Sequence, residues 1–259
     1  MQVAFIKDTA LHYHLRAGTG TPVVFLNSLG TDFRIWDRVI DGLGISAPIL
    51  TIDKRGHGLS DGGDISMDVL ISDVATVMDQ LDLGPALICG VSVGGMIAQG
   101  LAVTRPDLVA GLVLCCTGAK IGDAEGWNAR IDAVQSSGIA PMSEAILERW
   151  FSPHFRANRR AELAGYRNML SRTAPDGYAA VCGAIRDSDF TQTSSTIAVP
   201  THCISGGDDL STPPALVEAL ADLIPDATFE IIDQCAHLPC IETPEVVCYA
   251  LRNLYAKLP

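Results

Sequence analysis

Short apolar runs alternate with longer amphipathic segments along most of the chain. Helical spacing of apolar residues is found at 68–81, after an acidic start, and at 98–103 and 245–254, the last preceded by a capping threonine and a proline. Nearly continuous apolar runs of strand length, typical of strands buried on both faces, occupy residues 21–27, 47–53, 85–91, 109–116, 199–206 and 227–233. Strands that alternate with helices predict an α/β domain with a mostly parallel sheet.

The alternation stops after the run at 109–116. The next seventy or so residues contain no convincing strand, and their apolar spacing predicts helices at 126–138, 142–151, 159–172 and 175–187. The strand pattern then resumes at 199–206. We therefore predict a helical cap, residues 118–190, inserted into an α/β core that is formed by residues 1–117 and 191–259.

Charge is distributed unevenly between these two parts. The 259 residues have a formal net charge of −12, yet residues 118–190 hold nine basic and nine acidic side chains, and eight of the nine basic residues are arginines. The acidic excess therefore lies on the core. Because a nucleic-acid partner requires a basic face that neutralises phosphates, we expect no nucleic acid to bind.

Two further features concern the compartment. The first residues show no basic leader before a long apolar stretch, and no apolar run approaches the roughly 18–20 residues that cross a membrane. The cysteines lie mostly in apolar stretches, and none are spaced as C-x-x-C, which favours free thiols in a reducing compartment. We expect a cytoplasmic protein with no membrane partner.

The segment from Gly90 to Gly94 reads G-x-S-x-G, directly after the apolar run at 85–91 and before a helical segment. A sharp turn from strand to helix holds the serine in a sparsely populated backbone conformation, and the flanking glycines leave room for that turn. The first helical turn also directs free N–H groups towards the serine, where negative charge develops during acyl transfer. This pattern predicts Ser92 as a nucleophile.

A nucleophilic serine needs a base and an acid that orients it, in the chain order Ser, Asp or Glu, His. His237 lies in a loop between the run at 227–233 and the last helical segment. The sequence GGDDLSTPP, which follows the run at 199–206, offers Asp208 and Asp209 as the acid. The usual spacing between the preceding glycine and the following proline selects Asp209.

The oxyanion of such an enzyme is bound by two backbone N–H groups. Val93, next to the nucleophile, is expected to supply one of them, and Leu29, in the loop after the run at 21–27, is expected to supply the other. Asn27 and Ser28 occupy the positions where many enzymes of this type carry His-Gly.

Other histidines have weaker grounds for a catalytic role. The sequence DKRGHGLSDG, residues 53–62, is expected to close the far side of the pocket, with His57 in a structural role. The remaining histidines form no cluster with the spacing of metal ligands. We expect neither a metal ion nor a cofactor.

Together these motifs resemble the α/β-hydrolase superfamily, and more closely the bacterial 3-oxoadipate enol-lactonases. The closer resemblance rests on residues 90–102, 112–131, 167–190 and 206–214, two of which extend into the predicted cap. It implies the α/β-hydrolase fold and a serine hydrolase that opens 3-oxoadipate enol-lactone, a small anionic lactone of the β-ketoadipate pathway of aromatic degradation. General carboxylesterases and carbon–carbon bond hydrolases of aromatic catabolism use the same triad and are the alternatives, and a ligand receptor that has lost turnover is a third.

The implied substrate has a free carboxylate, which an acidic core would repel unless a cation lies at the pocket. Arginine binds carboxylates through two parallel hydrogen bonds, and the predicted cap is rich in arginine. We expect Trp127 and Arg130 to bind the substrate, with Lys120 and Arg34 as the next candidates.

Overall fold

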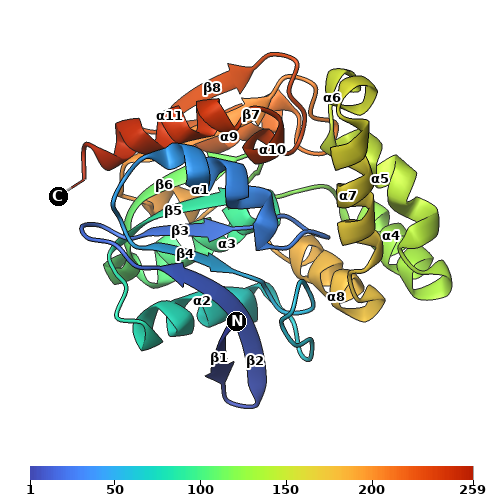
Figure 1. Ribbon diagram of the computed structural model, residues 1–259, viewed down its shortest axis with the longest axis horizontal. Helices are drawn as coiled ribbons and strands as arrows, with labels where there is room; N and C mark the ends of the chain where they lie inside the picture. The colour runs from blue at the N-terminus through green and yellow to red at the C-terminus, as the bar shows by residue number, and fades with distance from the viewer. Residues whose placement is uncertain (259) are drawn as a thin grey trace.

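The computed structural model describes residues 1–258 and contains one sheet of eight strands, in the order β1-β2-β4-β3-β5-β6-β7-β8 (Figure 1). Strands β3 to β8 run parallel to one another, and β2 pairs antiparallel with both β1 and β4. The strands are β1 (Gln2–Ile6), β2 (Thr9–Arg16), β3 (Val23–Leu26), β4 (Ile49–Ile52), β5 (Ala86–Val91), β6 (Val109–Cys115), β7 (Thr201–Gly206) and β8 (Thr228–Ile232). The predicted, mostly parallel sheet is confirmed.

All six predicted strands are present, and the antiparallel hairpin of β1 and β2 adds two that the sequence pattern did not predict. The reason lies in burial. Strands β3, β4 and β5 are buried along their whole length and read as apolar runs. Strands β1 and β2 lie at the edge of the sheet and are mostly half-buried, so that polar residues interrupt their apolar pattern.

Helices cover both faces of the sheet (Figure 1). The strand order reverses at β3, and parallel crossovers are right-handed, so the helix between β3 and β4 lies on the face opposite to the helices of the other crossovers. Accordingly α1 packs against α11, and α2 packs against α3. These helices of the core are α1 (Asp37–Leu43), α2 (Met67–Gln80), α3 (Val93–Thr104), α9 (Pro214–Leu223), α10 (Pro239–Glu242) and α11 (Pro244–Tyr255).

The helical patterns at 68–81, 98–103 and 245–254 correspond to α2, α3 and α11. Helices α1 and α9 were not predicted, since seven and ten residues show few repeats of the helical period. Single-turn 3₁₀ helices complete the inventory: η1 (Phe33–Trp36), η2 (Pro106–Leu108), η3 (Ala140–Met142) and η4 (Ser194–Thr196).

Between β6 and β7 the described chain contains helices and loops but no strand, and these helices form a separate layer beside the sheet (Figure 1). Four of them match the predicted helical segments, and α6, a short helix that Ser152 caps through the N–H of Phe155, was not predicted. We call this group the cap helices: α4 (Ala124–Ser137), α5 (Ser143–Trp150), α6 (Pro153–Asn158), α7 (Arg160–Ser171) and α8 (Pro175–Arg186). The cap helices follow β6 in the chain, whereas Ser92, Asp209 and His237 follow β5, β7 and β8.

The side chains of all eight cysteines are buried, and none forms a disulfide, which confirms the expectation of free thiols. Within residues 1–258 no helix combines the length and the apolar character that crossing a bilayer requires.

Candidate active site

Ser92 occupies the turn between β5 and α3 in a strained conformation. Its φ of 58° and ψ of −121° fall in a region that residues other than glycine rarely adopt. A Cβ atom on Gly90 would collide with the backbone of Gly94, and one on Gly94 would collide with the carbonyl of Leu26 in β3. Both glycines are therefore required by close backbone contacts, and Ser92 between them lines a cavity.

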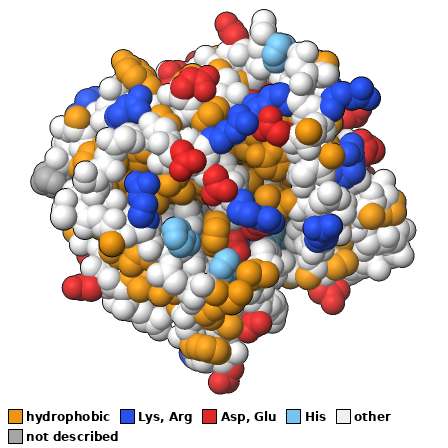
Figure 2. All heavy atoms as spheres, viewed as in Figure 1, with side chains coloured by type: hydrophobic (Ala, Val, Ile, Leu, Met, Phe, Trp, Pro, Cys, Tyr) orange, Lys and Arg blue, Asp and Glu red, His pale blue; other side chains and the backbone are white. Residues whose placement is uncertain are grey.

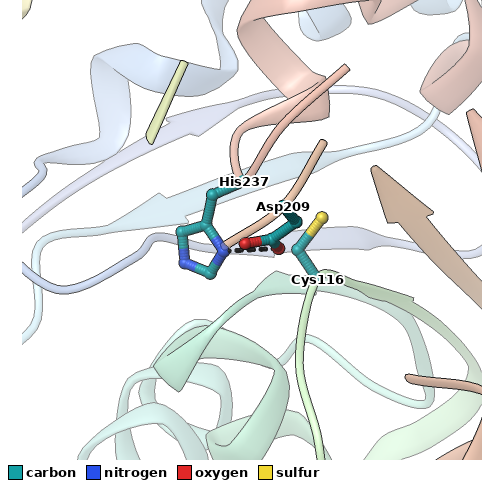
Figure 3. Close-up of side chains that lie close together, drawn as sticks. All are labelled: Cys116, Asp209 and His237. Atoms are coloured by element: carbon teal, nitrogen blue, oxygen red, sulfur yellow. Dashed lines mark hydrogen bonds and ion pairs between the residues drawn. The ribbon is translucent and has the colours of Figure 1, made fainter. Parts of the chain in front are cut away.

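Asp209 and His237 form a buried pair that two neighbouring strands position. Asp209 follows β7 and His237 follows β8, so parallel strands bring two residues that are 28 positions apart to one edge of the sheet. The Nδ1 atom of His237 lies 2.8 Å from Oδ2 of Asp209 (Figure 3). The second carboxylate oxygen accepts hydrogen bonds from the N–H groups of Ser211 and Thr212, at 2.7 and 3.0 Å.

The surroundings of Asp209 favour its ionised form. Burial alone would raise its pKa, but the charge of His237, the hydrogen bond from His237 and those from Thr212 lower the pKa of Asp209 below its ordinary value. Asp208, the alternative that the motif left open, is exposed, and its N–H donates to the carbonyl of Cys235. The geometry thus places Asp209, and not Asp208, beside His237.

Cys116 lies next to this pair. Its Sγ and the donor atoms of Asp209 and His237 lie within 4.8 Å of one another, a spacing that three ligands of a metal ion could adopt (Figure 3). A metal would need the thiolate form of the cysteine. Burial raises the pKa of Cys116 well above its ordinary value, and Asp209 and His237 already bind each other. These groups are therefore better suited to the pair of acid and histidine than to a metal.

A cavity of about 310 Å³ lies between the core and the cap helices. Its size is at the lower end of small-molecule sites. Ser92 and His237 line it together with Leu29, Trp127 and Arg130, so five of the seven predicted site residues reach the same space. Asp209 lies behind His237 and Val93 is buried, so neither reaches the cavity wall.

Two arginines, Arg130 of α4 and Arg149 of α5, line this cavity, and neither forms an ion pair with any residue in 1–258. The guanidinium of Arg130 lies 5.3 Å from the centre of the Trp127 ring, and Nε1 of Trp127 donates to the carbonyl of Ile121 at 2.6 Å. One Arg149 nitrogen is 3.5 Å from the carbonyl oxygen of Leu210. Both cations are therefore free to bind an anion.

The other two candidate cations lie elsewhere. Lys120 pairs with Asp189 at 3.3 Å, and Arg34 pairs with Asp32 at 2.6 Å, and neither lines the cavity of Ser92. Arg149 was not predicted as a site residue, although it lies in a predicted helix, because the pattern of residues 142–151 does not show which way the polar face of that helix points.

Tyr178 was also missed, although it lies in a segment on which the family resemblance rests. Its side chain is 1 % exposed and lines the cavity near Arg130. Burial raises the pKa of Tyr178, so its hydroxyl is protonated and can donate a hydrogen bond to a ligand.

The two expected oxyanion donors have no competing partner. Among residues 1–258 neither the N–H of Leu29 nor that of Val93 donates to a protein acceptor, whereas the N–H of Ser92 donates to the carbonyl of Cys115 at 3.0 Å. Val93 is the first residue of α3, where N–H groups lack partners within the helix. Free donors on both sides of Ser92 are what binding of an oxyanion requires.

His57 and its neighbours support the Leu29 loop from behind. The Nε2 atom of His57 accepts a 2.9 Å hydrogen bond from the N–H of Gly30, so Nδ1 carries the proton and faces the carbonyl of Arg55. Burial holds the pKa of His57 well below its ordinary value. His57 does not line the cavity of Ser92, in agreement with the structural role that we expected.

Glu242 connects the loop of His237 with the cap. It accepts hydrogen bonds from the N–H of Ala236 at 2.9 Å and from the hydroxyl of Ser152 at 2.5 Å. Burial raises the pKa of Glu242. This acid therefore links the residue before His237 to the start of α6.

A second, larger cavity of about 730 Å³ lies between the other side of the Leu29 loop and α7. Acidic and basic side chains, among them Asp37, Glu162 and Arg172, share its wall. Lys and Arg side chains lie close to Asp and Glu along the boundary between core and cap on the face that Figure 2 shows. The cavity of Ser92 has one acidic residue in its wall, Asp123, whose carboxylate accepts the hydrogen bond of the Gly126 N–H at the start of α4 and pairs with neither arginine.

The profile of the alpha/beta hydrolase family matches residues 23–250. The chain belongs to this family. It is 34 % identical to 3-oxoadipate enol-lactonase 1 of Acinetobacter baylyi over 86 % of this chain and 84 % of that protein, and 30 % identical to 3-oxoadipate enol-lactonase 2 of the same organism over 95 % and 92 %.

The crystal structure of the enol-lactonase from Burkholderia xenovorans superposes with a TM-score of 0.95 at 31 % identity, covering 98 % of this chain and all of that one. The α/β-hydrolase fold and the resemblance to enol-lactonases are therefore confirmed. The relatives support an enzyme of the carboxylic ester hydrolase class.

Proposed function

We propose that this protein hydrolyses 3-oxoadipate enol-lactone to 3-oxoadipate, with Ser92 as nucleophile, His237 as general base and Asp209 as the acid that orients it. The observation that carries the proposal is the composition of one cavity. Ser92 and His237 share it with Arg130 and Arg149, two cations without acidic partners. A nucleophile beside free cations suits an ester that also bears a carboxylate.

The chemistry follows from the position of each group. Asp209 accepts the hydrogen bond of Nδ1, which leaves Nε2 of His237 as the atom that takes the Ser92 proton. The serine oxygen attacks the lactone carbonyl, and the N–H groups of Leu29 and Val93 bind the oxyanion. The ring C–O bond then breaks, the imidazolium of His237 returns its proton to the departing enol oxygen, and the acyl group stays on Ser92.

The leaving group of this substrate is an enol oxygen, which is more acidic than an ordinary alcohol. It therefore needs less proton donation from His237 than an alkyl ester would. A water molecule, deprotonated by His237, then attacks the acyl group and frees the carboxylic acid and Ser92. The released enol becomes a ketone, and the loss of its hydroxyl discourages closure of the ring.

An anionic lactone also fits the charge of the molecule. The chain has a net charge of −12, and its acidic excess lies outside residues 118–190, so an anion meets less repulsion at the cap than at the core. Arg130 and Arg149 both belong to the cap helices. Charge-assisted hydrogen bonds from arginine to the free carboxylate would hold the lactone with its carbonyl at Ser92.

The substrate class is tested by comparing hydrolysis of the enol-lactone with that of p-nitrophenyl esters. We expect kcat/KM for the lactone to exceed that for the esters by several orders of magnitude. Equal or faster ester hydrolysis would show a general carboxylesterase and refute the assignment of the substrate.

The nucleophile is tested separately. A fluorophosphonate probe should label Ser92, and Ser92→Ala should abolish both the labelling and the burst of product in the first turnover. Retained lactone hydrolysis in Ser92→Ala would show direct attack by water. Binding of the lactone without labelling or turnover would show a receptor.

A further inference from the structure

Lys54 is a buried cation that the proposed mechanism does not use. It follows β4, its side chain is only 7 % exposed, and it lies outside the cavity of Ser92. Its Nζ donates a 2.6 Å hydrogen bond to the carbonyl of Ser28, and among residues 1–258 it forms no ion pair within 4.0 Å. A buried ammonium group is costly unless something compensates it, so this contact calls for an explanation.

The carbonyl of Ser28 and the N–H of Leu29 belong to one peptide group. In a trans peptide these two bonds point in opposite directions, so a lysine that binds the carbonyl from behind leaves the N–H facing away from it. Resonance within the peptide group couples the carbonyl oxygen to the N–H group. A cation at the oxygen draws electron density from the nitrogen and makes its N–H a stronger donor.

We propose that Lys54 is a positioning residue for the oxyanion site, whose ammonium group orients and polarises the Ser28–Leu29 peptide so that the Leu29 N–H binds the oxyanion more strongly. This inference rests on the proposed function, because it requires Leu29 to be an oxyanion donor. It assigns a role to the second residue of the DKRGHG sequence, which was expected only to close the far side of the pocket.

Other hydrogen bonds also hold the Leu29 loop in place. The effect of the Lys54 charge can therefore be measured separately from the effect of anchoring this loop. The hydroxyl of Thr31 donates to the same Ser28 carbonyl at 2.9 Å, and His57 accepts from the N–H of Gly30 at 2.9 Å. Thr31 is neutral and buried, so it is a matched control: it binds the same oxygen without a charge.

The environment of Lys54 makes its charge dependent on pH. Burial lowers the pKa of Lys54 to about 7, although Asp53 and Asp32 partly oppose this. Asp73 is already paired with Arg55 at 2.6 Å, and His57 is neutral. The titratable side chains around Lys54 are Asp32, Asp53, Arg55, His57 and Asp73. Only the ammonium form polarises the Ser28–Leu29 peptide, so the gain in acylation rate is lost as the pH rises through the pKa of Lys54.

The test measures the rate of acylation of Ser92 by p-nitrophenyl acetate, by stopped flow, in the wild type, Lys54→Met, Lys54→Arg and Thr31→Val. Removal of a whole oxyanion donor costs about 10²–10³ in rate, so loss of its polarisation in Lys54→Met should cost roughly 10-fold without weakening binding of the ester. Thr31→Val should change the rate by about 2-fold or less, because a neutral hydrogen bond contributes little net free energy.

The pH profile separates a polarising role from a structural one. Acylation in every variant also requires an unprotonated general base, so the rates are compared as ratios, in which this shared requirement cancels. The ratio of the wild-type rate to the Lys54→Met rate should fall between about pH 6 and 8, where Lys54 loses its proton. The ratio of the Lys54→Arg rate to the Lys54→Met rate should stay constant over the same range, because arginine keeps its charge.

A spectroscopic measurement on the wild type covers the case in which Lys54→Met does not fold. The ¹H and ¹⁵N amide shifts of Leu29 should titrate with the midpoint of Lys54. An amide that does not move through this range overturns the inference.

The inference also fails if Lys54→Met acylates at the wild-type rate, if the ratio of the wild-type rate to the Lys54→Met rate does not change with pH, or if Lys54→Met loses no more activity than Thr31→Val. Retained ester hydrolysis in Ser92→Ala has a different meaning, since it refutes the proposed function itself. Because the ester replaces the lactone, a wrong substrate assignment leaves this test intact.

Discussion

The imidazole of His237 donates from Nδ1 to Asp209 across 2.8 Å, and both side chains are almost completely excluded from solvent. A carboxylate in this position selects one tautomer of the histidine and stabilises the imidazolium that forms when it accepts a proton. The two residues are supplied by loops after adjacent parallel strands, so the rigid sheet determines the distance between them.

Replacing Asp209 by asparagine should abolish most of the activity. The amide can present its nitrogen to His237 and hold the wrong tautomer, so we expect kcat to fall by about 10⁴-fold. Asp208→Asn is the matched control, because Asp208 is exposed and adjacent, and it should retain activity within about 2-fold. Steady-state kinetics on the preferred substrate measure kcat for both variants and show which aspartate is the acid. The reverse result would assign the acid to Asp208.

Arg149→Ala and Arg130→Ala should weaken hydrolysis of the anionic lactone and spare that of a neutral ester. Loss of a hydrogen bond to a charged group costs about 1.5–3 kcal/mol, or roughly 10- to 100-fold in kcat/KM. Arg167→Ala serves as a control, since Arg167 pairs with Glu144 away from the cavity. An equal loss on both substrates would indicate damage to the cavity instead of lost carboxylate recognition.

Gly90→Ala should inactivate and destabilise the protein, because its Cβ would collide with the backbone of Gly94 in the turn that holds Ser92. Gly165→Ala is the opposite case: Gly165 lies in α7 with open space around it, and alanine should raise the free energy of unfolding by about 0.5–1 kcal/mol. Urea unfolding and an activity assay on both variants provide the comparison. A fully active Gly90→Ala would refute the steric argument.

Glu242→Gln should alter the dependence of stability on pH. Burial raises the pKa of Glu242, so the folded state binds the proton of this acid more tightly than the unfolded state does. The protonated acid therefore stabilises the folded state at low pH. This contribution to the free energy of unfolding is lost as the pH rises from the ordinary pKa of 4.5 through the raised pKa. Glutamine does not titrate. The stability of the wild type relative to Glu242→Gln should therefore increase as the pH falls, measured by urea unfolding between about pH 7 and 4.

The exposed Glu245, replaced by glutamine, controls for general effects of removing a carboxylate from this region. If the curves of free energy against pH for the wild type and Glu242→Gln run parallel, Glu242 does not titrate as its burial implies.

Most strands and the turn at Ser92 could be predicted from local sequence, because these features depend on residues that are neighbours in the chain. A strand buried on both faces must be apolar throughout, and the turn at Ser92 needs glycine two residues before and after it. The edge hairpin of β1 and β2 lacks such a constraint and was missed. The helices between β6 and β7 followed from the same logic, since helical periodicity replaced apolar runs in that part of the sequence.

Contacts between distant residues could be decided only by the tertiary structure. Residues 142–151 predicted a helix but not that Arg149 would face the cavity, which depends on how α5 packs on the core. The sequence DKRGHG did not show that Lys54 would reach Ser28, 26 positions earlier. Parallel β3 and β4 place those residues side by side. The sequence by itself thus determined the fold class and the chemical groups, and the packing of sheet and cap decided which of these groups meet.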